Sequence, residues 1–353
     1  MKLTVDQDKI VAFLVDLLNT PSPTGYHEEA CQCVIRTIEA LAIPDLVIER
    51  NRKGSVLITL PGAADDQPRA TSAHIDTLGA MVRQVKSNGR LLLVQLGGYA
   101  WNAVEGENVT VHTRLSGRRF RGTIQTITPS VHTSRDAREG KRDDERMEVR
   151  LDVRSSSKEE TVALGIGVGD FVYFDPRVEV TDTSYVKSRH LDNKAGVAVL
   201  YGALEALAAS SQRPAQRTTL MIGGYEETGH GAATGIPADV ADYVVLDMAA
   251  STTGEFQNSD EYSVGICAKD ATGPYDLSLT NHLAELCSAH QIAYNFDTYP
   301  NYGSDGSAFL RAGGDVRVGL IGPGIDASHA YERTHIDSLV ATTRLLLAWL
   351  LTP

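Results

Sequence analysis

The feature that most constrains this chain is a change of texture along its length. In the first and last parts, apolar residues with helical spacing alternate with short apolar runs, which is typical of α/β folds. From about 82 to 180, short alternating runs follow one another, broken by Gly, Asn and Asp, with no long helix among them. This spacing predicts a small barrel or sandwich. The plainest interpretation is one α/β domain, residues 1–81 and 182–353, split by an inserted β domain at 82–181.

The apolar spacing also predicts the individual elements. The expected helices cover 6–18, 28–42, 194–209, 279–290 and 338–351. The expected strands of the α/β part cover 46–49, 55–60, 70–73, 219–223, 243–246 and 316–320. Those of the β part cover 91–96, 108–113, 122–126, 148–153 and 171–174. The stretch 134–146 is charged and poor in apolar residues, so we expect an exposed loop there.

Length, composition and charge exclude several classes of protein. With 353 residues, 42% of them hydrophobic, the chain can bury a sizeable core as two domains or one large one. Its 45 Asp and Glu outnumber its 33 Lys and Arg, and the net charge of −12 argues against nucleic acid as a partner. Its 4 cysteines are interpreted as reduced thiols. Because no membrane span or targeting segment is visible, we expect a cytoplasmic protein that does not bind membranes.

Acids and histidines follow several of the predicted strands. In open α/β sheets, ligands bind outside the carboxyl ends of the strands, so segments far apart in sequence could meet at one site. The segments in question are His74-Ile75-Asp76, His190-Leu191-Asp192-Asn193-Lys194, Glu226-Glu227-Thr228-Gly229, Asp247, and the stretch from Asp326 to His335.

Each segment taken alone has an ordinary explanation beside the chemical one. His74 could bind a metal with Asp76 orienting its ring, or both could be polar residues at a strand end. Asp192 could bridge two cations, since it has two oxygens, or could cap the helix that follows it. Asp247 could be a ligand or an ordinary turn residue.

The pair Glu226-Glu227 is costly if both side chains are buried without a partner. One could bind a metal ion while the other moves protons, or both could belong to a solvated turn that ends at Gly229. The final segment offers His329 and His335, and the residues alone leave open which of them, if either, is a ligand.

Together these segments match the needs of a two-metal hydrolase: cations about 3.5–4 Å apart, an activated water and a general base. Nitrogen and oxygen ligands without Cys suit Zn, Co or Mn. A serine hydrolase is not expected because Gly303-Ser304-Asp305-Gly306-Ser307 lacks the G-x-S-x-G elbow, and the H-E-x-x-H zincin motif is absent. The glycines at 165, 167 and 169 lie among β strands and do not form a dinucleotide loop.

The order of these motifs resembles that of the TET-type cytosolic di-metal aminopeptidases, the family that includes bacterial glutamyl and deblocking aminopeptidases. The resemblance covers essentially the whole chain. It rests, in order, on Ala73-His74-Ile75-Asp76 with Leu78-Gly79-Ala80-Met81-Val82, Leu191-Asp192-Asn193-Lys194-Ala195-Gly196, Glu226-Glu227-Thr228-Gly229, Asp247, Gly303-Ser304-Asp305 and His329. It implies a mixed central sheet flanked by helices, the di-metal exopeptidase fold, with an inserted small all-β barrel domain.

The resemblance also implies a role for each site residue. His74 and Asp247 would bind the first metal ion, with Asp76 orienting His74. Glu227 and His329 would bind the second ion. Asp192 would bridge both ions, and Glu226 would be the general base that takes a proton from a water bridging the two. His329 is preferred to His335 because the Glu and Asp that follow it keep nearly their usual offsets. The family more often has two acids then Arg where this chain has Asp192-Asn193-Lys194.

The resemblance implies a metal-dependent aminopeptidase that removes N-terminal residues from short peptides with two divalent ions, Zn first and Co or Mn as alternatives. The Pro21 to Tyr26 segment and the last motif resemble one subgroup in particular, associated with the osmoprotectant N-acetylglutaminylglutamine amide. In that case the protein would be an amidase or deacylase of small N-acylated dipeptides. A non-enzymatic assembly or binding protein is the third hypothesis. Family members form homo-oligomers, up to dodecamers, through the inserted domain, which also limits substrate access.

Overall fold

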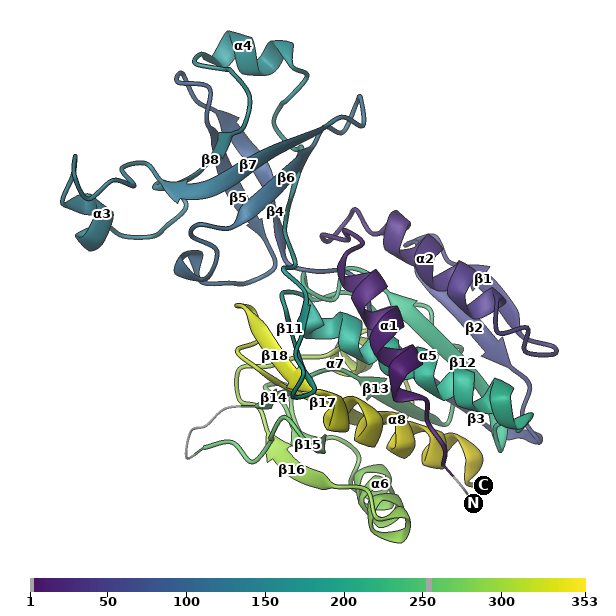
Figure 1. The fold of residues 1–353 in the computed structure, drawn as a ribbon. Coiled ribbons are helices and arrows are strands. Elements are labelled where there is room, and N and C mark those ends of the chain that lie inside the picture. Colours follow the sequence, from purple (N-terminus) through teal and green to yellow (C-terminus); the bar gives the residue numbers. More distant parts are fainter. Residues whose placement is uncertain (1–2, 252–255) are drawn as a thin grey trace. The chain divides into compact units, whose positions relative to one another are not determined.

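A computed structural model describes residues 3–251 and 256–353 (Figure 1). The chain divides into two compact units: unit 1 comprises Met1–Asp76 and Val178–Pro353, and unit 2 comprises Thr77–Arg177. The α/β class with an inserted β-barrel, predicted from the sequence, is confirmed. Among the described residues, no helix combines the length and the apolar character that a membrane span requires.

Unit 1 is built on one large mixed sheet. Its path runs β1-β2-β12-β3-β13-β17-β18-β11-β10, and β14, β15 and β16 join it beside β17. The strands are β1 (Val47–Arg50), β2 (Val56–Leu60), β3 (Ala64–His74), β10 (Glu179–Val180), β11 (Tyr185–Ser188), β12 (Gln216–Gly223), β13 (Asp242–Leu246), β14 (Ala249–Ser251), β15 (Val264–Lys269), β16 (Tyr294–Thr298), β17 (Arg317–Asp326) and β18 (Glu332–His335).

The centre of this sheet is parallel. β12, β3, β13 and β17 are neighbours, each parallel to the next, and in the β12–β3 pair Gly223 lies opposite His74. Because these strands run in the same direction, their carboxyl ends open on the same edge of the sheet. The loops that follow β3, β12 and β13 therefore begin close together, although they are far apart in sequence.

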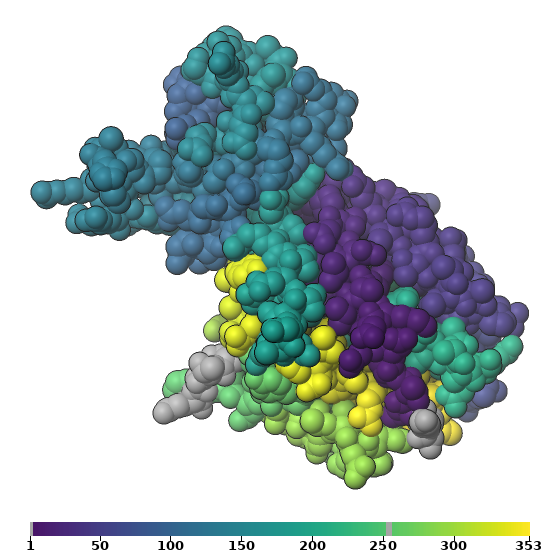
Figure 2. Space-filling view, viewed as in Figure 1, coloured from purple at the N-terminus to yellow at the C-terminus, as the bar shows by residue number. Residues whose placement is uncertain are grey.

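Helices cover both faces of the sheet, which explains the nearly continuous apolar runs of the central strands. The helices of unit 1 are α1 (Gln7–Leu18), α2 (Glu28–Glu39), α5 (Leu191–Ser210), α6 (Leu277–His290), α7 (Asp305–Arg311) and α8 (Ile336–Leu351). Leu220 and Ile222 of β12 belong to one core, shared with α1, α2, α5, α6 and α8. Met221, between them, belongs to the second core, against which Phe309 of α7 packs. Figure 2 shows α1, in purple, beside α8, in yellow, and both helices contribute side chains to the first core.

Unit 2 is a closed antiparallel barrel with the strand order β4-β5-β8-β7-β6-β9. Its elements are β4 (Gly79–Val85), β5 (Leu91–Leu96), η1 (Trp101–Ala103), β6 (Asn108–His112), β7 (Arg119–Thr126), α3 (Asp136–Glu139), β8 (Met147–Leu151), α4 (Lys158–Ala163) and β9 (Phe171–Phe174). Alternating side chains such as Leu91, Leu93 and Ile124 fill the interior. The domain boundary that the sequence places after residue 81 falls inside β4, and the stretch expected as an exposed loop contains α3, which buries no side chain.

Candidate metal centre

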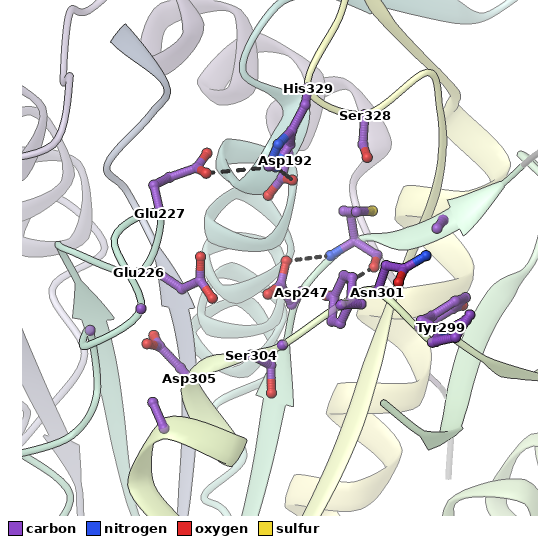
Figure 3. A pocket seen from close by; sticks show the side chains of 18 of the residues that line it. Asp192, Glu226, Glu227, Asp247, Tyr299, Asn301, Ser304, Asp305, Ser328 and His329 are labelled. Atoms are coloured by element: carbon purple, nitrogen blue, oxygen red, sulfur yellow. Dashed lines mark hydrogen bonds and ion pairs between the residues drawn. The ribbon is translucent and has the colours of Figure 1, made fainter. Parts of the chain in front are cut away.

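A cavity of about 580 Å³ lies in unit 1, where β12 and β13 end (Figure 3). Its lining includes five carboxylates, together with aromatic, amide, hydroxyl and small side chains. The lining residues on which the argument depends are Asp192, Glu226, Glu227, Asp247, Tyr302, Asp305 and His329. Two groups of potential metal ligands meet at this cavity, and each group is held together within 4.8 Å between ligand atoms.

The first group consists of His74, Glu226 and Asp247. His74 is the last residue of β3, and Asp247 follows the last residue of β13. The Nε2 atom of His74 lies 3.7 Å from Oε2 of Glu226 and 3.8 Å from Oδ1 of Asp247. His74 and Asp247 are buried, with 2% and 4% of their surface exposed. The parallel register of the central strands thus brings these residues together.

The second group consists of Asp192, Glu227 and His329. Its members come from α5, from the loop after β12, and from the turn between β17 and β18. Nε2 of His329 lies 3.6 Å from Oε2 of Glu227. The His329 side chain is 37% exposed, and its backbone has a φ of 64°. This group is therefore more open to solvent than the first and lies on irregular backbone.

Asp192 connects the two groups. Its Oδ1 atom lies 3.1 Å from Nε2 of His74, and its Oδ2 atom lies 3.3 Å from Nε2 of His329. The cap position of α5 belongs to His190, so the side chain of Asp192 is directed to the two histidines and does not cap the helix. One carboxylate therefore offers one oxygen to each group.

The backbone around His74 sets the direction of its ring. Nδ1 of His74 donates a hydrogen bond to the carbonyl oxygen of Asp76, 3.0 Å away, so Nε2 is the ring nitrogen that faces the carboxylates. The carboxylate of Asp76 is 3.6 Å from the same Nδ1. It also accepts hydrogen bonds from the backbone N–H of Glu226 at 3.2 Å and from the hydroxyl of Thr24 at 2.7 Å. Asp76 thus connects the first histidine to the segment that carries Glu226.

Glu226 and Glu227 lie on a loop after β12 that is held by contacts among its own residues and with Lys53. The loop opens with Tyr225 at a φ of 70°, whose ring stacks on that of His230 at a centroid distance of 5.1 Å. Gly229 donates its N–H to the carbonyl oxygen of Glu226 at 2.7 Å. The ammonium of Lys53 donates to the carbonyl oxygens of His230 and Gly231. These contacts fix the loop, so the two adjacent acids have defined directions.

Two residues that support the site were assigned no role from the sequence. Asn193, next to Asp192, is fully buried. Its amide donates to the carbonyl oxygen of Leu246, the last residue of β13, at 2.8 Å, so it holds the start of α5 against the end of that strand, next to Asp247. The hydroxyl of Tyr302 donates to the carbonyl oxygen of Met248 at 3.1 Å. Asn193 stands inside the helix-opening motif, but no sequence signal shows its distant partner, and Tyr302 carries none at all.

The other candidate histidine lies elsewhere. His335 is the N-cap residue of α8, and its Nδ1 accepts a hydrogen bond from the backbone N–H of Asp337 at 3.1 Å. Its ring packs against those of Tyr185 and Tyr262, with centroid distances of 5.0 and 5.3 Å. The side chain of His335 therefore does not line the cavity that His329 lines.

The electrostatics of the cavity favour bound cations. Burial and the charge of Asp192 raise the pKa of Glu227 well above its usual range, and burial and Asp247 do the same for Glu226. The pKa of Asp247 rises to about 7, because of burial first and of Asp192 second. Burial lowers the pKa of His74, but its hydrogen bonds to Asp192 and Asp76 outweigh this and raise it. The protein alone thus leaves these acids poorly compensated.

A divalent ion in each group would relieve this repulsion. Among the described residues, Oε1 of Glu227 is buried and has no hydrogen-bond partner, as expected of an atom meant for a ligand. Imidazole nitrogens and carboxylate oxygens, without Cys, are the donor set preferred by Zn, Co or Mn. The residues present therefore fit a pair of divalent metal ions.

Known proteins similar to this chain match it over nearly its whole length. A family model described as M42 glutamyl aminopeptidase matches residues 54–345. A relative from Bacillus subtilis (strain 168), named "Putative aminopeptidase YhfE", is 45% identical over 347 residues, which is 98% of each chain.

Solved structures share the fold at lower identity. An aminopeptidase from Desulfurococcus kamchatkensis has a TM-score of 0.88 and 21% identity, covering 98% of this chain and 96% of its own. The TET1 peptidase of Pyrococcus horikoshii has a TM-score of 0.83 and 22% identity, covering 98% of this chain and 100% of its own. It is described as assembling into a tetrahedron or a large octahedral shell.

Proposed function

The chain belongs to the M42 glutamyl aminopeptidase family, and from this premise we propose that it is a di-metal aminopeptidase acting on short peptides with a free N-terminus. The single observation that carries the proposal is the position of Asp192, with one oxygen 3.1 Å from His74 and the other 3.3 Å from His329. A carboxylate shared in this way, between two groups that each hold a histidine and a further acid, is suited to bridging two ions.

The residues would divide the work as follows. His74 and Asp247 would hold one metal ion, Glu227 and His329 the other, and Asp192 both. When bound, such ions polarise a peptide carbonyl and lower the pKa of water. Asp76 keeps the proton of His74 on Nδ1, so that Nε2 stays free to act as a ligand.

Glu226 would be the general base. Its carboxylate lies close to His74 and Asp247, and its backbone N–H donates a hydrogen bond to Asp76, which fixes its position directly after Tyr225. Its carboxylate would take a proton from the water as the water oxygen bonds to the carbonyl carbon of the first peptide bond. It would then deliver this proton to the leaving nitrogen as the C–N bond breaks, which releases the first residue as a free acid. A base must act as a carboxylate, and the positive charge of bound ions would keep it deprotonated despite its burial.

The test is a hydrolysis panel followed by mass spectrometry. Purified protein loaded separately with Zn, Co or Mn is offered free-amine peptides beside N-acetylated dipeptide amides of the same sequence. Cleavage of the free-amine peptides alone supports the proposal. Cleavage of the acetylated compounds alone would replace it with an amidase or deacylase activity at the same metal centre, and no cleavage of either would favour a non-enzymatic role.

We also propose that the protein is a homo-oligomer and that unit 2 contributes to assembly and to substrate access. The proposal is supported by family membership and by the assemblies described for the TET1 peptidase of Pyrococcus horikoshii. Light scattering on the purified chain tests it: we expect a mass several times 38.1 kDa. A monomer mass at micromolar concentration would refute it.

A further inference from the structure

One buried carboxylate beside the metal centre has no part in the proposed mechanism. Glu332 is the first residue of β18, and 2% of its surface is exposed. Its Oε2 atom accepts a hydrogen bond from the backbone N–H of Asp192, and its Oε1 atom accepts one from the backbone N–H of His329, both at 3.1 Å. A single side chain therefore joins the backbones of two residues of the second group, which lie on different elements.

The strand pairing explains why Glu332 can reach both. β18 pairs with β11 in antiparallel register, and Glu332 lies opposite Ser188. The chain leaves β11 toward Asp192 and enters β18 from His329, so both site segments flank the same end of this strand pair. The next residue, Arg333, points to the other face of the strand, where it forms a bidentate ion pair with Glu261 at 2.7 Å.

The hydrogen bonds of Glu332 indicate that it supports the ligand residues and is not itself a metal ligand. Both carboxylate oxygens of Glu332 already accept an N–H, and neither metal-ligand group of the described residues includes it. The N–H groups belong to the proposed ligand residues themselves, both of which lie in irregular backbone. His329 has a positive φ of 64°, and Asp192 has non-helical dihedral angles inside α5. Because neither residue has the dihedral angles of a regular helix or strand, side-chain contacts such as those from Glu332 contribute to holding them in place.

We infer that Glu332 is a positioning residue that clips Asp192 to His329 and thereby sets the spacing of the second metal-binding group. The inference rests on the proposed function, since it assumes two metal ions. Loss of the clip disturbs two of the three proposed ligands of the second ion, Asp192 and His329, but only Asp192 among those of the first ion. His74 and Asp247 keep their places at the strand ends, because neither contacts Glu332 through a hydrogen bond that the structure shows.

The test compares Glu332→Gln with Glu261→Gln. Each change removes one carboxylate at β18, since Glu332 lies on this strand and Glu261 pairs with its Arg333. Only Glu332→Gln removes an oxygen that accepts a hydrogen bond from the backbone of a proposed ligand. The side-chain amide that Glu332→Gln introduces would present a donor to one of the two N–H groups. We expect Glu332→Gln to weaken the binding of one of the two metal ions by about 10–100-fold, the usual effect of losing a residue that supports a ligand. Glu261→Gln keeps two ions.

Metal content by elemental analysis, measured across a series of buffered free zinc concentrations, gives the stoichiometry and the two affinities. The absorption spectrum of the cobalt-loaded protein shows whether one site has changed geometry. Peptide hydrolysis should show a lower kcat with little change in KM, restored by excess metal. Two ions bound to Glu332→Gln with wild-type affinity, or an equal loss of both, would overturn the inference.

If Glu332→Gln does not fold, a second variant can still test the inference. Glu332→Asp retains the charge but shortens the reach, so it cannot span both N–H groups and should also weaken one ion selectively. Failure of the proposed function itself would look different, because wild-type protein would then bind fewer than two ions or hydrolyse no peptide. The effect on affinity is read from metal content, independently of activity.

Discussion

The two ligand groups of the candidate centre are held in different ways. His74 and Asp247 lie at the ends of neighbouring parallel strands and are almost fully buried. His329 lies on a turn with a positive φ and is 37% exposed, and Asp192 lies in the irregular first turn of α5. The first group is thus a product of sheet register, whereas the second depends on individual side-chain contacts. We therefore expect the second group to release its ion more readily.

The largest effect is expected from Glu226→Gln, which tests whether Glu226 is a metal ligand of the first group or a general base beside it. Glu226 lies within reach of His74 and Asp247, so it could be either a base or a third ligand. As a base, its loss should lower kcat by about 10²–10⁴-fold with both ions retained. The measurement pairs steady-state kinetics with metal content. Loss of an ion would make Glu226 a ligand and leave the base unassigned.

Substituting one histidine at a time compares the groups directly. His74→Ala and His329→Ala should each lose one metal ion. Each should also lower activity by more than the roughly 10–100-fold expected from loss of a residue that only supports a ligand. His74→Ala should also lower the thermal stability more, since it leaves a cavity and buried acids behind. Calorimetry and elemental analysis on the two variants check this order, which the reverse ranking of stabilities would contradict.

Asp76→Asn tests the support of the first group. The carbonyl oxygen that accepts the His74 N–H is unchanged, but the side chain loses one of the oxygens that hold Thr24 and Glu226. We expect about a tenfold loss of kcat, the low end of the range for such supporting residues, with both ions retained. A larger loss than that of Glu332→Gln would show that support matters more in the buried group than in the open one.

The pH dependence of the metal-free protein concerns the buried group. The pKa of Asp247 is raised to about 7, so the folded state binds a proton that the unfolded state has released above about pH 4. Stability from this group is present at low pH and is lost as the pH rises through that interval. The melting temperature of chelator-treated protein should therefore fall between about pH 4 and about pH 7, and less so in Asp247→Asn. An unchanged slope in that variant would exclude Asp247 as the cause.

The smallest effect is expected from His335→Ala. This side chain caps α8 by accepting the N–H of Asp337, so its loss should cost about 1 kcal/mol of the free energy of unfolding. Metal content and kcat should not change, because His335 lies outside the cavity. Denaturant unfolding and elemental analysis provide both readings. A lost ion would reopen the choice between His329 and His335.

The same difference between the groups explains what the sequence could predict. The second half of β3, which ends at His74, is buried, and β13, which ends just before Asp247, is buried and apolar. Their ends are therefore visible as the points where histidine and acids begin. The turn that carries His329 has no such pattern, and two histidines remained possible there from the residues alone. Glu332 and Asn193 act on the backbone of residues distant in sequence, and no local signal shows such contacts.

The fold follows the same rule. The long amphipathic helices and the inserted barrel were predicted because their apolar spacing repeats over many residues. The strands β11, β15, β16 and β18 and the short helix α7 were not, since no repeated apolar spacing marks them. The strands are stabilised by their neighbours in the sheet, and α7 packs on β13 and β17. β4 was missed because it begins directly after the site segment at Asp76, where the change of unit interrupts the pattern.

The shared carboxylate of Asp192 has a consequence for how the two ions bind. In the proposed centre, an ion held by one oxygen of Asp192 would also restrict the rotation of the other oxygen, so the binding of the two ions would be energetically coupled. By linkage, the factor by which the first ion changes the affinity for the second equals the factor by which the second changes the affinity for the first. Loading of such a centre would therefore be cooperative, and the fraction of chains that hold both ions would depend on the metal concentration differently from that of two independent sites.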